Sequence, residues 1–359
     1  IIIVYSYERG FLMERKAMTA VYSAAHFLVD LSCAFLMMRF ILGGASENFL
    51  MYNFCAFALQ MPIGIILDKL GGGHRAASVG CGLIFSAYFV AFVGLLTPAA
   101  ICAGVGNALF HAGGGVYVLD KYESSGALGV FVSPGAVGLY LGTIWGKWND
   151  MSFILPMAAM LIAAVFIFIS PYIFKCDDKR GGAVEAFFDF KTSFPLCAAA
   201  FMFFAVVVIR SYGGFALSYP WKITPAAAFT AVIMTAGGKA LGGFVSDRFG
   251  KEKTAAVSMV LAAVLYLFSN NIVCGLAAIL IFNMSMPITL RAAADIFKGG
   301  RGFSFGLLTF ALFLGYVPSY IYGGVQISRA AMCILCILSA AMLLGGFALM
   351  KKTVQKNDG

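Results

Sequence analysis

Charged residues are scarce in this sequence of 359 residues. Asp, Glu, Lys and Arg make up 11% of it, and hydrophobic residues make up 61%. A soluble domain carries about 25% charged residues, so this composition, with a mean hydropathy of +0.91, excludes an ordinary soluble protein. Apolar stretches of about 20 residues recur along the whole length, each long enough to cross roughly 30 Å of hydrocarbon. We therefore expect an all-α integral membrane protein.

Signatures of catalysis and of bound cofactors are missing as well. The sequence has no zinc-ligand spacing, no nucleophile–base pair, no phosphate-binding loop and no heme motif. Cys333 and Cys336 have CxxC spacing, but they lie in the last apolar run without a nearby histidine or charge, which is typical of small packing residues. We therefore expect no enzymatic activity, no cofactor and no metal site.

A charged turn occurs twice instead, with the pattern G-x-x-x-D-x-x-G at the end of a long apolar run. The matched residues are Gly64, Asp68 and Gly71 in the first turn and Gly243, Asp247 and Gly250 in the second. All three positions are offset by 179 residues, which is half of the sequence. A repeat at half-length inside a hydrophobic chain predicts two related membrane halves.

The apolar runs predict twelve transmembrane helices in two pseudo-symmetric halves of six. We place them at 17–43, 47–67, 76–96, 98–119, 126–146, 151–174, 193–217, 223–245, 254–270, 272–294, 302–323 and 328–350. The N-terminal half then comprises residues 1–175, and the C-terminal half comprises residues 193–359. The most polar connection, 176–192, is expected to be a cytoplasmic linker.

The basic residues predict the orientation of these helices. Nineteen of the 25 Lys and Arg residues fall on the side that holds both termini, three fall on the opposite side, and three lie inside spans. Because basic loops stay in the cytoplasm, both termini are expected there, in a multi-pass protein of the inner membrane. The net charge of +9 then reflects topology, and no nucleic-acid partner is expected.

Two six-helix halves, a central cytoplasmic connection and the turn after the second helix of each half resemble the major facilitator superfamily (MFS). The resemblance covers essentially the whole chain. It implies the MFS fold, in which the first, fourth, seventh and tenth helices line a central cavity. We also expect a monomer.

A narrower likeness rests on the first and fourth spans. His26 and Asp30 in the sequence Ala-His-Phe-Leu-Val-Asp, together with His111 after a phenylalanine, resemble the fosmidomycin-resistance branch of drug exporters. That branch tends to have Phe-His-Pro-Glu in the fourth helix. Here Ala112 and Gly113 follow the histidine, so the substrate of that branch does not carry over.

Asp30 is the expected proton-coupling residue, with His26 and His111 as its partners. A charge at mid-bilayer costs at least ~2.5–3.5 kcal/mol, so it calls for a partner or a function. His26 and Asp30 are four residues apart and share one helix face. The alternative is a permanent ion pair of Asp30 with Arg210 or Arg39 that only holds helices together, with the histidines as ordinary hydrogen-bonding groups.

Arg210 is the expected substrate-binding residue, because a guanidinium group matches a carboxylate or phosphonate. The other expected substrate residues are Asn107, Tyr212, Asn283 and Lys239. Lys239 could instead form an ion pair near the cytoplasmic face. Asp30, Arg210 and Lys239 sum to one positive charge, which favours an anionic or zwitterionic ligand.

The repeated turns are expected to form a cytoplasmic gate. Each aspartate would accept backbone N–H groups at the start of a helix in the other half, where the helix dipole is positive. The expected donors lie near Gly302 and Ser304 for Asp68, and near Ser125 and Gly126 for Asp247. Arg75 would orient Asp68, and Arg291 and Asp295 are assigned to the same gate. The alternative is ordinary helix capping beside positively charged loops.

These features together predict a proton-coupled secondary transporter that works by alternating access and exports a small anionic or amphiphilic compound. An importer of an organic anion by proton symport would use the same residues. A membrane sensor without transport is the third possibility. The expected partners are a small anionic molecule, protons and the lipid bilayer.

Overall fold

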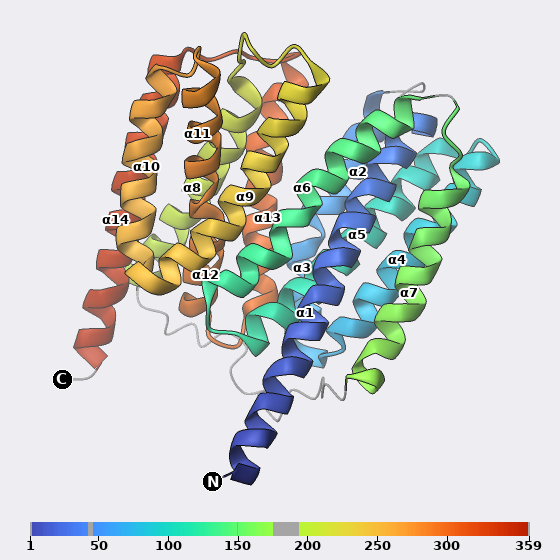
Figure 1. The fold of residues 1–359 in the computed structure, drawn as a ribbon, viewed down its shortest axis with the longest axis horizontal. Helices are drawn as coiled ribbons and strands as arrows, with labels where there is room; N and C mark the ends of the chain where they lie inside the picture. The colour runs from blue at the N-terminus through green and yellow to red at the C-terminus, as the bar shows by residue number, and fades with distance from the viewer. Residues whose placement is uncertain (1, 42–45, 149, 175–193, 358–359) are drawn as a thin grey trace.

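The computed structural model describes residues 2–41, 46–148, 150–174 and 194–357, with side chains described for 14–41, 47–148, 150–174 and 194–353. Every regular element among these residues is a helix (Figure 1). The predicted linker 176–192 lies outside the described residues, so a division of the chain there stays a prediction.

The helices form two bundles (Figure 1). The first bundle contains α1 (Ile2–Leu36), the π-helix η1 (Met37–Ile41), α2 (Ser46–Ala58), α3 (Gln60–Leu70), α4 (Gly73–Phe92), α5 (Leu96–Lys121), α6 (Ser125–Lys147) and α7 (Ile154–Ile173). The second contains α8 (Phe194–Ala216), α9 (Pro225–Phe249), α10 (Lys251–Leu267), α11 (Ile272–Asn283), α12 (Ser285–Ile296), α13 (Arg301–Ile321) and α14 (Arg329–Asn357). Both ends of the described chain lie at the same end of the bundles, which we call the terminal side.

Eleven helical stretches among the described residues are long and apolar enough to cross a membrane. Three of them join neighbouring helices: α1 with η1, α2 with α3, and α11 with α12. The remaining predicted span, 254–270, corresponds to α10, whose 17 residues lie at the short end of the range of roughly 17–25 that can span a bilayer. Twelve crossings are therefore not confirmed by length and composition.

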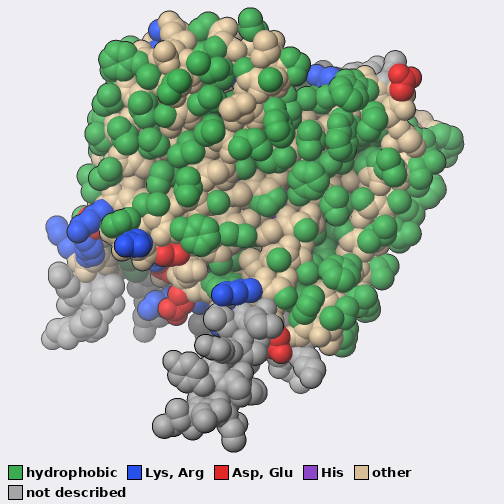
Figure 2. Space-filling view, viewed as in Figure 1, with side chains coloured by type: hydrophobic (Ala, Val, Ile, Leu, Met, Phe, Trp, Pro, Cys, Tyr) green, Lys and Arg blue, Asp and Glu red, His purple; other side chains and the backbone are tan. Residues whose placement is uncertain are grey.

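The surface of the bundles is hydrophobic. Figure 2 shows one face covered by apolar side chains, with most of the visible Lys, Arg, Asp and Glu gathered along its lower edge near the chain ends. Exposed side chains such as Phe166 and Val257 would be unfavourable in water but suit a lipid environment. The chain is therefore a multi-pass membrane protein.

The two bundles meet through closely packed helices, α3 against α13 and α6 against α9. A Cβ atom at Gly64 would lie 2.1 Å from the carbonyl oxygen of Gly302, and one at Gly243 would lie 2.4 Å from that of Ser125. Glycine at these positions lets the backbones approach. The repeated turns thus begin with a glycine at each contact between the bundles.

Candidate functional site

Each repeated aspartate binds the start of a helix in the other bundle. The carboxylate of Asp68, at the end of α3, accepts hydrogen bonds of 2.8 Å from the backbone N–H groups of Gly302 and Phe303 on α13. The carboxylate of Asp247, at the end of α9, accepts 2.8 Å bonds from Ser125 and Gly126 on α6. These N–H groups have no partner within their own helices and lie at the positive end of the dipole. We call these two contacts the latches.

The glycines that end the repeated turns take up positive φ angles, +70° at Gly71 and +93° at Gly250. Such a backbone suits glycine and ends α3 and α9 directly after the latch residues. The second donor is the backbone N–H of Phe303, between the two predicted positions, because the backbone N–H of Ser304 donates to the carbonyl of Gly300 at 2.9 Å.

Two arginines of the second bundle close the same side. Nη1 of Arg291 on α12 donates to the carbonyl of Tyr122 at 2.6 Å, and Nη1 of Arg301 on α13 donates to the carbonyl of Leu119 at 2.7 Å. Both carbonyls lie at the C-terminal end of α5, where the helix dipole is negative and favours cations. Latches and arginines together bridge the bundles on the terminal side.

Asp295 and Arg75, both predicted to belong to the gate, differ in their contacts with the residues that bridge the bundles. Asp295 accepts hydrogen bonds from Arg291 at 2.7 Å and from Lys251 at 2.6 Å, so it orients the arginine without itself crossing between bundles. The expected contact of Arg75 with Asp68 does not form. The Arg75 side chain is exposed, and none of the hydrogen bonds or ion pairs among the described residues involves it.

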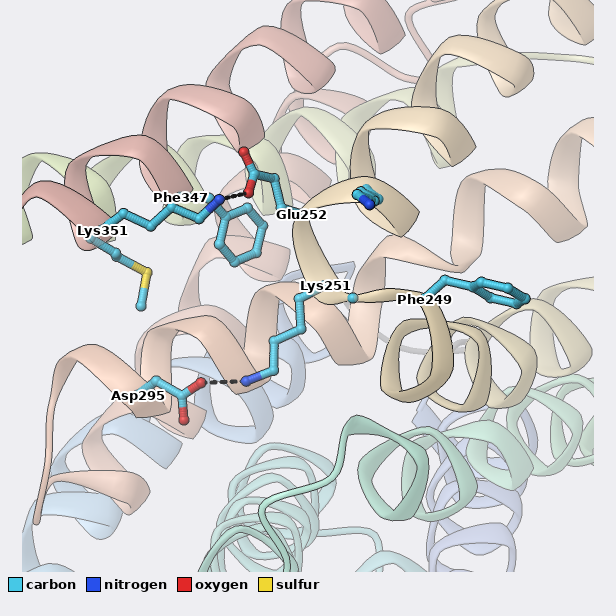
Figure 3. Close-up of a pocket in the computed structure, with 9 residues that line it drawn as sticks. Phe249, Lys251, Glu252, Asp295, Phe347 and Lys351 are labelled. Carbon is cyan, nitrogen blue, oxygen red and sulfur yellow. Dashed lines mark hydrogen bonds and ion pairs between the residues drawn. The ribbon is translucent and has the colours of Figure 1, made fainter. Parts of the chain in front are cut away.

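A surface pocket of about 600 Å³ lies beside Asp295, on the terminal side of the second bundle (Figure 3). Its lining includes two ion pairs, Lys251 with Asp295 and Lys351 with Glu252. Phe249 and Phe347 supply apolar walls. The pocket contains none of the residues expected to bind substrate, so it is no part of a central transport site.

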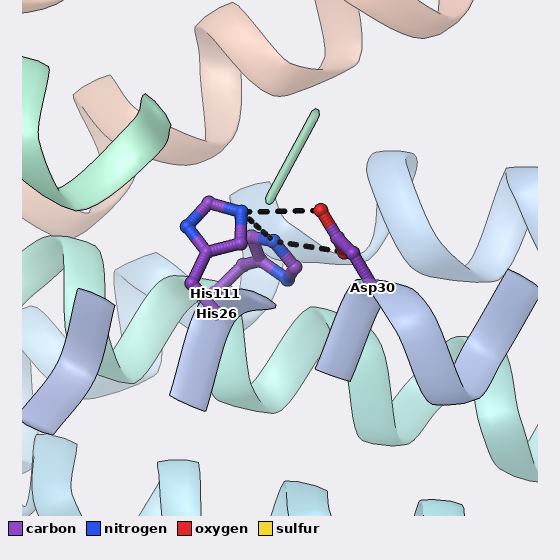
Figure 4. Close-up of side chains that lie close together, drawn as sticks. All are labelled: His26, Asp30 and His111. Atoms are coloured by element: carbon purple, nitrogen blue, oxygen red, sulfur yellow. Dashed lines mark hydrogen bonds and ion pairs between the residues drawn. The ribbon is translucent and has the colours of Figure 1, made fainter. Parts of the chain in front are cut away.

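The expected proton-coupling residues form one cluster in the first bundle, drawn in Figure 4. Nε2 of His26 lies 2.9 Å from Nε2 of His111 and 3.3 Å from Oδ2 of Asp30. Nε2 of His111 lies 3.5 Å from Oδ1 of Asp30. The two histidines are buried, whereas 19% of the Asp30 side chain remains exposed. We call these three residues the central cluster.

Backbone carbonyls fix the tautomer of both histidines. Nδ1 of His26 lies 2.8 Å from the carbonyl oxygen of Phe131, and Nδ1 of His111 lies 2.9 Å from that of Asn107. A carbonyl oxygen can only accept, so each Nδ1 carries the proton and each neutral ring has a lone pair on Nε2. Two lone pairs and the carboxylate of Asp30 therefore face one another.

Two backbone carbonyls of α6 near Pro134 accept hydrogen bonds from side chains of other helices. Pro134 lies inside α6 and has no backbone N–H, so the helix lacks the hydrogen bond from residue 134 to the carbonyl of Val130. Side chains donate to carbonyls there: His26 to Phe131, and Lys239 to Val132 over 3.4 Å. This turn of α6 thus contacts both the central cluster and α9 of the second bundle.

Asn107 contacts the central cluster, and its role in binding substrate stays a prediction. Its side-chain nitrogen lies 3.4 Å from Oδ1 of Asp30 and 3.4 Å from the hydroxyl of Tyr52. Gly135 on α6 borders the same cluster, since a Cβ atom there would lie 2.3 Å from Nε2 of His26. Tyr52 and Gly135 were missed from the sequence, where neither residue stands near another polar group of the cluster.

Two basic residues of the second bundle, Arg210 and Lys239, form no ion pair with this cluster among the described residues. Arg210 on α8 is 7% exposed, and its Nη1 has no hydrogen-bond partner in the described part of the chain. Lys239 on α9 interacts electrostatically with both Arg210 and Asp30. In the described part of the chain, Asp30 pairs with the histidines and forms no ion pair with Arg210 or Arg39. Arg39 donates instead to the carbonyl of Met151.

Tyr212 and Asn283 are not brought to Arg210 by any polar contact among the described residues. Tyr212 follows Arg210 by two positions and so lies toward another face of α8, where Gly315 of α13 packs against its backbone. The side-chain amide of Asn283 donates to Ile279 within its own helix at 2.8 Å. A substrate role for these two residues stays a prediction.

Three consecutive glycines on α5 lie between the central cluster and the gate. A Cβ atom at Gly113 would lie 2.3 Å from the carbonyl of Gly73 on α4, and one at Gly115 would lie 2.5 Å from the ring of Phe305 on α13. Gly114 faces the ring of Phe131 on α6. Three different helices, one from the other bundle, therefore press on α5 at this point.

No protein-family model matches the sequence, and no curated protein sequence matches it. Solved structures do resemble it. The fucose:proton symporter FucP of E. coli matches with a TM-score of 0.64 and 12% identity over 92% of this chain and 98% of its own. FucP in the outward conformation matches with a TM-score of 0.64 and 14% identity over 94% and 99%.

The human organic anion transporter MFSD10 (TETRAN) matches with a TM-score of 0.66 and 14% identity over 92% of this chain and 99% of its own. At such identities the likeness establishes the fold and does not single out the fosmidomycin-resistance branch. The chain has the fold of major facilitator superfamily transporters.

Proposed function

We propose that this chain is a proton-coupled secondary transporter that moves a small anionic solute by alternating access. The observation that carries the proposal is the gate: two carboxylates and two guanidinium groups bridge the bundles at helix ends, all on one side. Such contacts are polar and few, so they can form and break as two rigid bundles rock about a central site.

The proposed orientation places the gate at the cytoplasm. Basic side chains gather on the terminal side, and the positive-inside rule assigns that side to the cytoplasm of an inner membrane. In this conformation the latches are formed, so the proposed state is closed toward the cytoplasm. We propose that the protein acts as a monomer, since each latch is completed within one chain.

The central cluster is the proposed proton site. Two Nε2 lone pairs and a carboxylate meet there with no donor between them, and a single proton placed among them would turn repulsion into hydrogen bonding. The histidine tautomers leave only this side of each ring open to a proton. Asp30, with 19% of its side chain exposed, is the member that could exchange the proton with the cavity.

Arg210 is the proposed anchor for the solute, with Lys239 beside it. A buried guanidinium group whose Nη1 lacks a hydrogen-bond acceptor destabilises the protein. An anionic group of the solute would supply that acceptor. Lys239 interacts with both Arg210 and Asp30, so a bound anion would draw this cation away from the carboxylate. Solute binding would thereby change the affinity of the cluster for a proton, which is the coupling that either direction of transport needs.

Export in exchange for protons is our first proposal for the direction. Symport into the cell is the second, and it is favoured by the name of one structural neighbour, a fucose:proton symporter. An anionic solute agrees with the name of another neighbour, an organic anion transporter. A sensor without transport would keep the latches but carry no flux.

Proteoliposomes with a pH-sensitive dye inside would test the proposal. A panel of organic anions and phosphonates, first screened by thermal shift on the purified protein, would be offered with and without an imposed pH gradient. We expect proton flux that depends on an anion, and its sign gives the direction. Asp30→Asn should abolish this flux, whereas Asp150→Asn, an exposed residue on the opposite side, should leave it intact. Equal flux in the Asp30 variant would refute the coupling assignment.

A further inference from the structure

We propose that His26, Asp30 and His111 also form a binding site for one divalent ion of a first-row transition metal, with Zn²⁺ as the probe. The three side chains come from α1 and α5, and their ligand atoms all lie within 4.8 Å of one another. They include two of the three histidines of the whole sequence. This inference does not depend on the proposed transport function.

The spacing of the ligand atoms fits a metal ion. Zn–N bonds of about 2.0–2.1 Å and Zn–O bonds of about 2.0–2.2 Å place neighbouring ligand atoms roughly 3.0–3.4 Å apart. The observed separations are 2.9 Å between the two Nε2 atoms and 3.3 and 3.5 Å from Nε2 to the carboxylate. Each oxygen of Asp30 faces a different histidine, so the carboxylate could bind through both oxygens or through one after a small rotation (Figure 4).

The histidines are already in the state that a metal requires. A ligand imidazole binds through a bare nitrogen while its other nitrogen donates to a carbonyl or carboxylate, which fixes the ring. Here Nδ1 of His26 donates to Phe131 and Nδ1 of His111 donates to Asn107, so both Nε2 lone pairs point at the common centre. Two imidazoles and one carboxylate favour zinc, iron, nickel or copper over Mg²⁺ and Ca²⁺, which prefer oxygen ligands alone.

Gly135 on α6 packs directly against the ligand atoms. A Cβ atom at this position would lie 2.3 Å from Nε2 of His26 and 2.4 Å from Oδ2 of Asp30. Only glycine fits here without displacing these two side chains. Gly135→Ala would push the ligand atoms out of their arrangement without removing a ligand.

Lys239 is the positive charge that an incoming ion would meet. It interacts electrostatically with Asp30 and His111 from the second bundle and would oppose a divalent cation. Lys239→Met should therefore raise the affinity for Zn²⁺. An ion bound elsewhere, for example by the cysteines, would not respond to this change.

A bound ion would occupy the lone pairs that the proposed function assigns to a proton. Zn²⁺ should then inhibit coupled flux, and this consequence, unlike the binding itself, rests on the proposed function. Binding measured on protein in detergent and inhibition measured in proteoliposomes can fail separately, so the two proposals can be told apart.

The test is isothermal titration of purified full-length protein with ZnCl₂, together with the visible absorption of bound Co²⁺. We expect one high-affinity ion per chain, no response to MgCl₂, and at least a tenfold loss of affinity in His26→Gln, His111→Gln and Gly135→Ala. His74→Gln is the matched control, since His74 is the third histidine and is buried on α4 outside the cluster.

Thermal unfolding would show that each variant is folded, and Gly135→Ala keeps the test decisive if a histidine variant is not. Unchanged Zn²⁺ affinity in folded Gly135→Ala and in either histidine variant would overturn the proposal. A Co²⁺ spectrum dominated by thiolate charge transfer would overturn it as well, because it would place the ion on cysteines.

Discussion

Replacing Asp68 by asparagine should open the gate, because it removes the charge from one latch. The wild-type carboxylate accepts two hydrogen bonds, both of 2.8 Å, from Gly302 and Phe303. Asparagine has a single acceptor oxygen, and its amide group would face the second N–H as another donor. The substitution changes the shape of the side chain very little, so the packing of Gly64 against α13 is retained.

The expected size of the effect follows from these two bonds. A hydrogen bond to a charged group contributes about 1.5–3 kcal/mol, and a carboxylate at a helix N-terminus gains a further ~0.3–1 kcal/mol from the dipole. In the open state water replaces part of both contributions, so we expect a net loss of about 2 kcal/mol. The ratio of closed to open protein should then fall roughly 30-fold.

Double electron–electron resonance, which measures the distance between two spin labels, would detect this shift from closed to open protein. Labels at Glu123→Cys and Lys253→Cys, both exposed on the terminal side and on different bundles, would report the gate in a background without the native cysteines. We expect a longer distance to appear in Asp68→Asn and not in Asp150→Asn. An unchanged distance distribution in a folded Asp68→Asn protein would show that the latch does not hold the gate.

Three further substitutions test neighbouring parts of the structure. Gly64→Ala would push a methyl group to within 2.1 Å of the carbonyl oxygen of Gly302. This overpacking should destabilise the closed state by about 1–3 kcal/mol. We expect a longer spin-label distance and little change in the thermal unfolding of the protein. Arg291→Lys retains a charge near Asp295 but loses the planar fork that reaches Tyr122, so it should also favour the open gate, and an unchanged distance would contradict this role. Arg210→Lys should weaken binding of the transported anion at least tenfold in isothermal titration, and equal affinity would remove Arg210 from the solute site.

The positions of the membrane helices could be predicted from the sequence because hydrocarbon thickness imposes their length. The predicted span 98–119, for example, corresponds to α5 at Leu96–Lys121. Local interruptions were missed: the second predicted span is divided into α2 and α3, and the tenth into α11 and α12. Apolar composition is the same on either side of such breaks, so hydropathy carries no signal for them.

The candidate site was predictable where it depends on one helix and unpredictable where it depends on how helices are rotated against each other. His26 and Asp30 share a face because they are four residues apart, and the structure retains that relation. The contact of Asn107 with Asp30 depends on the rotation of α5 against α1, which the sequence does not show. The contact expected between Arg75 and Asp68 from their nearness in sequence is absent, and the Arg75 side chain is exposed.

The glycine run of α5 provides a point about which this helix could pivot. Gly113, Gly114 and Gly115 are held between three neighbouring helices, while His111 lies just on one side of that point and the carbonyl of Leu119 lies on the other. If Arg291 and Arg301 release the C-terminal end of α5, the helix can pivot at the glycines, and the part that carries His111 then moves in the opposite direction. In the proposed mechanism, opening the gate would then move His111 relative to His26, so the geometry of the proposed metal site would depend on the state of the gate.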